Sequence, residues 1–568
     1  MPAESPLRAA VEARLAAWEA DRVAERLWAR DGTLWGASGS SPGELAAWLG
    51  WLDLPASMPV RATELDRLVR EVRDDGYTRG AVLGMGGSSL APELFSRLFG
   101  DPLGIPRAGS EGLELRILDS THPDAVRGFR EWAESGRTLF CVSSKSGTTT
   151  EPNAFHAAMS AHAPALDFVA ITDPGTPLAE LARSQGFRAI VDGEPSVGGR
   201  YSALSAFGLL PAALHGVDID LLLQRASEMA DACRRPAGTN PGLRLGATLG
   251  EAALQGRDKL TLLTSPRLTS FADWAEQLVA ESTGKAGRGI VPVVGEPVGD
   301  AASYGEDRVF VVLTLTDEAH PELDALAAEL RAAGHPVEQI ALNDPYDVGA
   351  EFLRWEVATA TAAIVLGINP FDQPNVQQSK DATRTLLDAY RRSGSLPVAA
   401  PWVAEPGISA HLDPAAIGDE PVSVAGALRA LLDSAHDRDY LAIQAFVPAD
   451  QPAAELLQRL RAAVRDRRGL ATTLGFGPRY LHSTGQLHKG GPPSGVFLQL
   501  TADPDRDLPI PGWQESFGTL IAAQAMGDLA ALQGIHRRVL RLHLGELASG
   551  LKRVESMIRR ALVDTLDS

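Results

Sequence analysis

Short β-rich runs alternate with helical patterns over much of this 568-residue chain. Unbroken apolar strands that are separated by helices indicate a parallel sheet covered on both faces. Five such runs lie between Gly80 and about residue 215, and three more follow before about residue 392. The pattern therefore predicts two successive α/β units. The runs lie at 81–86, 113–120, 138–144, 166–172, 187–192, 259–265, 290–295 and 308–315.

The two ends of the chain have different patterns. Residues 1–75 combine helical periodicity with turn signals and carry five tryptophans, for which we favour packing of a helical cap over a carbohydrate platform. Residues 393–422 are rich in Pro, Gly, Ala and Ser and are interpreted as a linker or long loop. Two more strand-like runs follow at 440–447 and 494–501. The expected parts are 1–75, 76–220, 221–400 and 401–568.

The charge of the chain limits its partners. It carries 72 acidic and 53 basic residues, a formal net charge of -19, which disfavours nucleic acid and anionic membranes as ligands. A phosphorylated ligand would need a local positive site. The longest apolar stretch, 357–368, is too short to span a bilayer, and no signal peptide is visible, so we expect a cytoplasmic protein. Cys141 and Cys233 fit a reducing compartment.

The first candidate loop follows the run at 81–86. Gly84, Gly86, Gly87, Ser88 and Ser89 connect a buried strand to a helix. Glycines let a backbone approach a ligand closely, and a helix N-terminus offers unpaired N–H groups to an anion. Strand–Gly–helix turns are also common for purely steric reasons. The glycines could therefore serve either to contact a ligand or to allow close packing of the turn, and the sequence favours neither explanation.

The second candidate loop follows the run at 138–144. It contains Ser144, Lys145, Ser146, Thr148 and Thr149 directly before a helix. A helix cap needs one hydroxyl, so this density of donors favours a phosphate cradle. No P-loop spacing is present, and we expect the phosphate to belong to a molecule smaller than ATP.

A helical segment that begins at Ser270 carries a carboxylate on its apolar face. Phe271, Trp274, Leu278 and Glu281 share this face, and Gln277 lies one turn before the glutamate. Burial would raise the pKa of such a carboxyl toward the range of a general base. Alternatively, the helix frays and Glu281 meets water. Periodicity does not distinguish these two interpretations.

Three further segments carry polar side chains in suggestive places. Arg200 follows two glycines on a tight turn, 369–380 joins two helical stretches, and 477–491 contains two histidines, His482 and His488. The histidines have little apolar context, so both are expected to be accessible. None of these segments identifies a function alone.

Together the segments resemble the glucose-6-phosphate isomerase family, which is built from two sugar-isomerase (SIS) domains. The resemblance rests on GMGGSS, SSKSGTT, GGRYS, QLVAESTGK and NPFDQPNVQQSK, which occur in the family's order, and on LHSTGQ. It implies an α/β fold of two doubly wound parallel-sheet domains, with the helical cap and a C-terminal α/β extension added. It also implies interconversion of glucose 6-phosphate and fructose 6-phosphate through a cis-enediol.

The resemblance also implies roles for individual residues. Glu281 would carry the proton between C2 and C1, and Arg200 would stabilise the enediol oxygens. Lys380 and His482 would assist opening of the sugar ring. No metal or other cofactor is expected. The implied substrate-binding residues are Gly87, Ser88, Ser144, Lys145, Ser146, Thr148, Thr149, Gln277 and Gln373.

One block departs from the family order. LHSTGQ lies about a hundred residues after Lys380, whereas the family places it between the Glu and Lys blocks. In this the chain resembles the isomerase half of bifunctional transaldolase/glucose-6-phosphate isomerase proteins. Either His482 reaches the same pocket by another chain path, or a different residue opens the ring.

Other functions remain as alternatives. An isomerase of mannose or heptose phosphate differs only in residues that the sequence does not place. A non-catalytic sugar-phosphate sensor would be expected to carry a DNA-binding helix-turn-helix and a basic surface, and the chain shows neither. A transaldolase is disfavoured because the eight βα repeats of its barrel are missing. A homodimer is expected by analogy.

Overall fold

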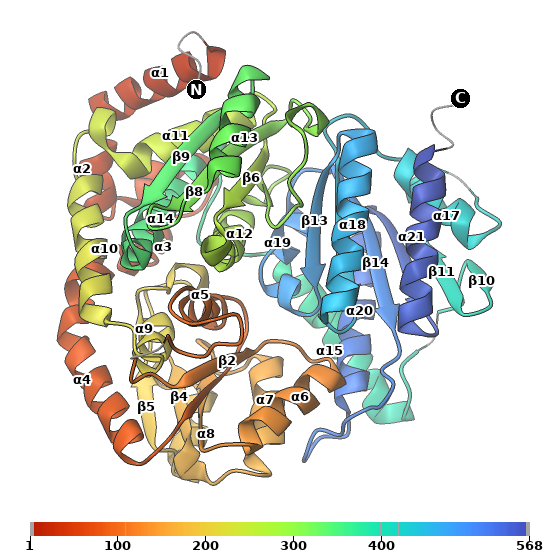
Figure 1. Cartoon of the computed structure of the whole chain (residues 1–568), viewed down its shortest axis with the longest axis horizontal. Helices are drawn as coiled ribbons and strands as arrows, with labels where there is room; N and C mark the ends of the chain where they lie inside the picture. The colour runs from red at the N-terminus through yellow and green to blue at the C-terminus, as the bar shows by residue number, and fades with distance from the viewer. Residues whose placement is uncertain (1–4, 108–109, 398, 419, 564–568) are drawn as a thin grey trace.

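The computed structural model describes residues 5–107, 110–397, 399–418 and 420–563 (Figure 1). Three N-terminal helices pack against helices of the two α/β units and do not form a separate body. They are α1 (Pro6–Ala20), α2 (Val23–Trp28) and α4 (Leu54–Asp74). Trp35 and Trp51 are almost fully buried, and the indole of Trp35 donates to the carbonyl of Ala360 at 2.8 Å. These two tryptophans therefore pack in the core, as the favoured interpretation predicts.

The first sheet contains five parallel strands in the order β2-β1-β3-β4-β5. Because β1 and β3 are neighbours, the loops that follow them leave the same edge of the sheet side by side. The strands are β1 (Arg79–Gly84), β2 (Glu114–Leu118), β3 (Thr138–Ser143), β4 (Phe168–Thr172) and β5 (Ala189–Asp192). The covering helices are α5 (Leu90–Leu98), α6 (Pro123–Glu134), α7 (Thr150–Ser160), α8 (Pro177–Gln185) and α9 (Ala206–Leu214).

The second sheet contains four parallel strands in the order β7-β6-β8-β9. Its last strand was not predicted, because its buried and exposed positions alternate as on an edge strand. The strands are β6 (Lys259–Thr264), β7 (Val291–Val293), β8 (Arg308–Leu315) and β9 (Val337–Leu342). The helices of this part are α10 (Ile219–Cys233), α11 (Pro241–Leu254), α12 (Thr269–Thr283), α13 (Pro321–Ala332) and α14 (Val348–Leu366).

A third sheet, in the order β10-β11-β15-β14-β12-β13, follows in the C-terminal part. The interpretation of 393–422 as a linker or long loop is wrong in part, since β10, β11 and the short helix α16 (Pro414–Ile417) lie there. β13 and β15 were also missed. The strands are β10 (Val403–Glu405), β11 (Ile408–Leu412), β12 (Tyr440–Phe446), β13 (Ala471–Phe476), β14 (Gly495–Ala502) and β15 (Arg538–Leu544).

The C-terminal part packs closely on the rest of the molecule. Val293 of β7 shares an apolar cluster with Tyr440 and Leu532, and α15 (Val376–Ser393) packs along α20 (Phe517–Gly534). In Figure 1 the blue C-terminal elements lie beside both α/β units. The other helices here are α17 (Val424–Asp433), α18 (Gln451–Arg468), α19 (Gly485–Gly490) and α21 (Leu547–Val563). The domain boundaries at 75, 220 and 400 stay predictions.

Candidate active site

The glycines of the first loop are required by close packing. Gly86 has a φ of +55°, and a Cβ there would lie 2.8 Å from Gln277 Nε2 and 2.9 Å from the carbonyl oxygen of His482. A Cβ on Gly87 would lie 1.9 Å from the carbonyl oxygen of Gly199. The steric alternative therefore explains both glycines. Ser88, the predicted sugar neighbour, is buried beside them.

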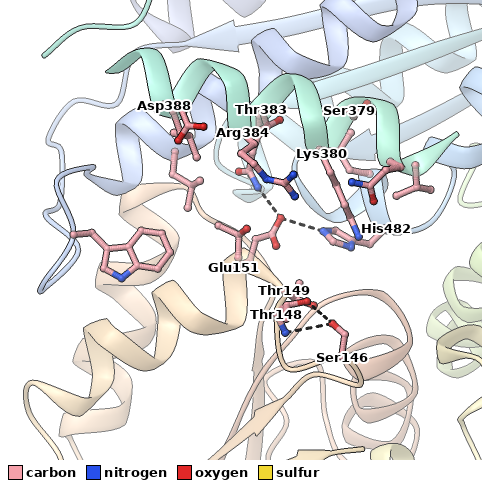
Figure 2. Close-up of a pocket in the computed structure, with 18 of the residues that line it drawn as sticks. Ser146, Thr148, Thr149, Glu151, Ser379, Lys380, Thr383, Arg384, Asp388 and His482 are labelled. Atoms are coloured by element: carbon pink, nitrogen blue, oxygen red, sulfur yellow. Dashed lines mark hydrogen bonds and ion pairs between the residues drawn. The ribbon is translucent and has the colours of Figure 1, made fainter. Parts of the chain in front are cut away.

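The second loop lines a cavity of about 430 Å³ with its hydroxyl groups (Figure 2). Ser146 and Thr148 hydroxyls lie 2.9 Å apart, and Ser144 Oγ donates to Thr149 Oγ1 at 3.0 Å. Thr149 is the N-cap of α7, yet its side chain makes no capping hydrogen bond. The hydroxyls are thus not used for capping, and the positive end of the α7 dipole faces the same loop.

Lys145 does not point into this cavity. Its ammonium forms an ion pair with Asp173 and donates to the carbonyls of Glu194 and Pro195 at 3.1 and 3.3 Å. The side chain does not line the cavity. In this structure a carboxylate of the loop after β4 binds the ammonium, and phosphate contact by Lys145 stays a prediction.

Glu281 and Arg200 form an ion pair that is linked to the His482 segment through Gln277. Glu281 Oε1 lies 3.5 Å from an Arg200 guanidinium nitrogen, and its other oxygen accepts from Gln277 Nε2 at 3.1 Å. The side chain of Glu281 is 12% exposed. Helix α12 continues to Thr283, so the alternative in which the helix frays before Glu281 is wrong.

The guanidinium of Arg200 is held rigidly. It is 4% exposed, and its remaining N–H groups all donate within the protein. Two of the acceptors are backbone carbonyls of the 369–373 segment, which fixes this segment against α12. The acceptors are Ser282 Oγ at 2.8 Å, Gln373 Oε1 at 3.0 Å, and the carbonyls of Pro370 at 2.6 Å and Asp372 at 3.0 Å.

His482 reaches the site from the C-terminal part of the same chain. It ends a short 3-10 helix, Arg479–His482, and its ring lines the cavity with 15% exposure. Its backbone carbonyl accepts from Gln277 Nε2 at 2.8 Å, which joins the cavity to the Glu281 pair. His488, by contrast, is buried on α19 against Gln444, so the expectation that it is accessible is wrong.

Glu151, in the first turn of α7, is a site residue that the sequence interpretation missed. Its Oε1 lies 3.1 Å from His482 Nε2 (Figure 2). Burial raises the pKa of Glu151, but His482, a backbone N–H and Lys380 outweigh it, and the net pKa lies below the usual value. A carboxylate can only accept, so Nε2 carries the proton and Nδ1 is left available. The sequence feature that could have identified Glu151 is an acidic residue directly after the hydroxyl-rich loop.

Lys380 lies opposite the hydroxyl loop, on α15. Its exposed side chain lines the cavity together with Ser379, Thr383 and Arg384 of the same helix (Figure 2). The structure thus brings Ser146, Thr148, Thr149, Lys380 and His482 to one cavity. An adjoining cluster is formed by Arg200, Gln277, Glu281 and Gln373. Ser144 contributes to the cavity through its hydrogen bond to Thr149.

The described part of the chain offers neither a metal site nor a membrane helix. No group of three or more His, Cys, Asp and Glu side chains suited to a metal ion occurs in 5–107, 110–397, 399–418 and 420–563. Over those ranges, no helix combines the length and apolarity needed to cross a membrane. Cys141 and Cys233 are both buried and unpaired.

Solved structures share this architecture. A hypothetical protein from Thermus thermophilus has a TM-score of 0.55 at 25% identity, over 66% of this chain and 98% of that one. A glucose-6-phosphate isomerase from Chlamydia trachomatis has a TM-score of 0.52 at 19% identity, over 67% and 86%. The two parallel sheets covered by helices are thus the α/β fold class that this chain shares with these solved structures.

Curated relatives narrow the class. A glucose-6-phosphate isomerase of Synechococcus sp. (strain JA-3-3Ab) is 33% identical over 371 residues, 56% of this chain and 67% of the relative. Another, from Rubrobacter xylanophilus, is 28% identical over 422 residues, 66% of this chain and 94% of the relative. No family model matches. The chain belongs to the glucose-6-phosphate isomerase family. Its likeness to the isomerase half of bifunctional proteins stays a prediction.

Proposed function

We propose that the chain interconverts glucose 6-phosphate and fructose 6-phosphate through a cis-enediol. The observation that carries the proposal is the Glu281–Arg200 pair, which adjoins a hydroxyl-lined cavity through the backbone of His482. Binding alone would not require a partly buried carboxylate against a fixed guanidinium, so this pair favours an enzyme over a sensor.

The phosphate group would bind at the second loop. Ser146, Thr148 and Thr149 offer hydroxyl donors, and the N-terminus of α7 adds its unpaired N–H groups and dipole. Lys380 and Arg384 contribute positive charge across the cavity from the loop. These groups supply the local positive site that an acidic chain needs for a dianionic ligand.

Ring opening would follow at His482 and Lys380. Because Glu151 fixes the proton on His482 Nε2, the free Nδ1 can take the proton of the anomeric hydroxyl while the ring C–O bond breaks. Lys380 would donate to the ring oxygen as it leaves. The products of this step are the open-chain aldehyde and a free hydroxyl at the former ring oxygen.

Proton transfer would then take place at Glu281. Its carboxylate removes the proton from C2, a C1–C2 double bond forms, and the negative charge moves to the oxygen on C1. Arg200 is already held in place and stabilises this oxygen without reorganisation. The proton of the C2 hydroxyl moves to the oxygen on C1, and Glu281 returns its own proton to C1, so that C2 becomes the carbonyl carbon of the ketose. C1 is thereby reduced and C2 oxidised, so no external oxidant is needed.

A coupled assay tests the reaction, with fructose 6-phosphate supplied and glucose 6-phosphate detected. We expect wild-type turnover and loss of about 10³-fold or more in kcat for Glu281→Gln, with sugar-phosphate binding retained. Glu322→Gln, on an exposed position of α13, is the control and should match the wild type.

Two outcomes would contradict the proposal. A near-normal kcat in Glu281→Gln would exclude Glu281 as the general base. A wild type that is silent with fructose 6-phosphate, but is stabilised by it against heat, points to a sensor or to another sugar such as a mannose or heptose phosphate. The expectations of a homodimer in the cytoplasm belong to the same proposal and are tested by light scattering and cell fractionation.

A further inference from the structure

Helix α20 buries two polar side chains one turn apart. Gln524 is 4% exposed and Asp528 is fully buried, although most of this helix is apolar. Burying an amide and a carboxylate costs free energy unless each finds good partners. Both side chains have such partners, and all of these partners belong to other segments of the chain.

Gln524 holds the carboxylate that faces His482. Its Nε2 donates to Glu151 Oε1 at 2.7 Å, and its Oε1 accepts from the buried hydroxyl of Thr121 at 2.7 Å. The hydroxyl of Thr121 and the carboxylate of Glu151 together fix which end of the amide faces which partner. The same Glu151 oxygen therefore receives donors from Gln524 and His482. Gln524 lines the cavity, but both ends of its amide are already engaged.

Asp528 joins the two segments that carry the ring-opening residues. Its Oδ2 accepts from Tyr480 Oη at 2.6 Å, and Tyr480 lies two residues before His482. Its Oδ1 accepts from Ser379 Oγ at 3.2 Å, and Ser379 directly precedes Lys380. Burial and the neighbouring carboxylate raise the pKa of Tyr480 well above its usual value, so its hydroxyl stays a donor.

Lys489 balances the charge of Asp528. Its ammonium lies 2.6 Å from Asp528 Oδ1, and both side chains are almost completely buried. A buried ion pair of this kind adds little net stability to the fold. Removal of one partner is nevertheless strongly destabilising, because it leaves the other charge buried and unpaired. The geometry around Asp528 is thus strongly determined.

We propose that α20 positions the ring-opening groups of this site: Gln524 orients His482 through Glu151, and Asp528 sets the separation of His482 and Lys380 through Tyr480 and Ser379. This inference rests on the proposed function. Gln524 and Asp528 are positioning residues, since neither exchanges a proton with the sugar. The C-terminal part of the chain then determines the ring-opening step, while α12 and Arg200 determine the enediol step.

The test separates these two steps. In a Glu281→Gln parent the isomerisation is blocked, but opening and reclosure of the ring still interconvert the anomers of glucose 6-phosphate. NMR exchange spectroscopy measures this interconversion at equilibrium. We expect Gln524→Leu in this parent to slow protein-catalysed anomer exchange about tenfold or more, because displacing a catalytic group by about 1 Å is that costly. Gln533→Leu, on the same helix, is the matched control and should leave the rate unchanged.

A second pair of variants distinguishes positioning from folding. Gln524→Glu places another carboxylate against Glu151, which should raise the pKa of the pair and move the acid limb of the kcat profile to higher pH. Tyr480→Phe removes only the hydroxyl that contacts Asp528 and should lower kcat with KM within about twofold, since the hydroxyl loop is untouched. If Gln524 and Tyr480 only stabilised the fold, Gln524→Glu would not shift the acid limb of the kcat profile, and Tyr480→Phe would not lower kcat without also changing KM.

The outcomes that overturn the inference are distinct from those that overturn the proposed function. Unchanged anomer exchange in Gln524→Leu, or equal changes in KM and kcat for Tyr480→Phe, would remove the positioning role. A Glu281→Gln parent that does not accelerate anomer exchange would remove ring opening at His482 and with it this inference. In either case the coupled assay of the unmodified chain still reports on isomerisation separately.

Discussion

Arg200→Lys probes the enediol step most directly, because it keeps the charge and removes the planar fork. The guanidinium contacts five acceptor groups, Glu281 included, while an ammonium has three N–H groups. At least two contacts are therefore lost. Loss of one fixed electrostatic stabiliser of an oxyanion costs about 2.7–4 kcal/mol, which is about 10²–10³ in kcat.

The same substitution should also lower stability. Hydrogen bonds to a charged group contribute about 1.5–3 kcal/mol each, so two lost contacts amount to about 3–6 kcal/mol before the segment at 369–373 relaxes. Thermal unfolding at constant buffer measures this loss, and the coupled assay at a temperature well below the transition measures kcat. The KM for the sugar phosphate should change little, because Arg200 does not line the cavity around the hydroxyl loop.

Arg244→Lys serves as the control, since this arginine makes a surface pair with Glu12 and is 40% exposed. It should leave kcat and the unfolding temperature close to the wild type. If Arg200→Lys kept kcat within about threefold, the fixed guanidinium would not be stabilising the enediol oxygen. That result would refute the reasoning even if the protein were less stable.

Three further results are expected. Burial, with Asp273 beside it, raises the pKa of Glu276 to about 8 from 4.5, so the folded state favours the neutral acid. The free energy of unfolding therefore falls by up to about 5 kcal/mol as the pH rises from 4.5 to 8. Glu276→Gln should raise the unfolding temperature more at about pH 8.5 than at about pH 5, and equal gains would contradict this. His482→Ala should slow anomer exchange in the Glu281→Gln parent, and an unchanged rate would exclude His482 from ring opening. EDTA should leave turnover unchanged, and its loss on chelation would contradict the proposed proton transfer without a metal.

The sequence pattern predicts the parallel strands well where they are continuous and apolar. β1, β3 and β8 are fully or almost fully buried on both faces; β3 and β8 lie within the predicted runs, and β1 begins two residues before its run. β15 was missed because Arg538, Arg541 and His543 alternate with its apolar residues, a pattern that is typical of a solvated segment. A strand with one polar face needs its neighbours in the sheet to be recognised.

The candidate site could be predicted in part, for physical reasons. Glu281 and Gln277 are one helical turn apart, so local periodicity already places them together. The direction of Lys145 could not be predicted, because Asp173 comes from the next strand's loop. Nor could periodicity show that His482 meets Glu151, which lies 331 residues earlier in the chain. Such long-range pairs depend on the docking of whole layers.

The long separation between these partners has a consequence during synthesis on the ribosome. Glu151 and Gln524 are 373 residues apart, so the nascent chain has released both parallel sheets long before α20 emerges. Domains generally fold as units from the N-terminus during translation. A stalled or prematurely ended chain that lacked α20 would therefore carry the hydroxyl loop, the Glu281–Arg200 pair and the ring-opening side chains without the helix that we propose positions these side chains. Full activity on cyclic sugars would appear only as a late event, after nearly the whole polypeptide had left the exit tunnel.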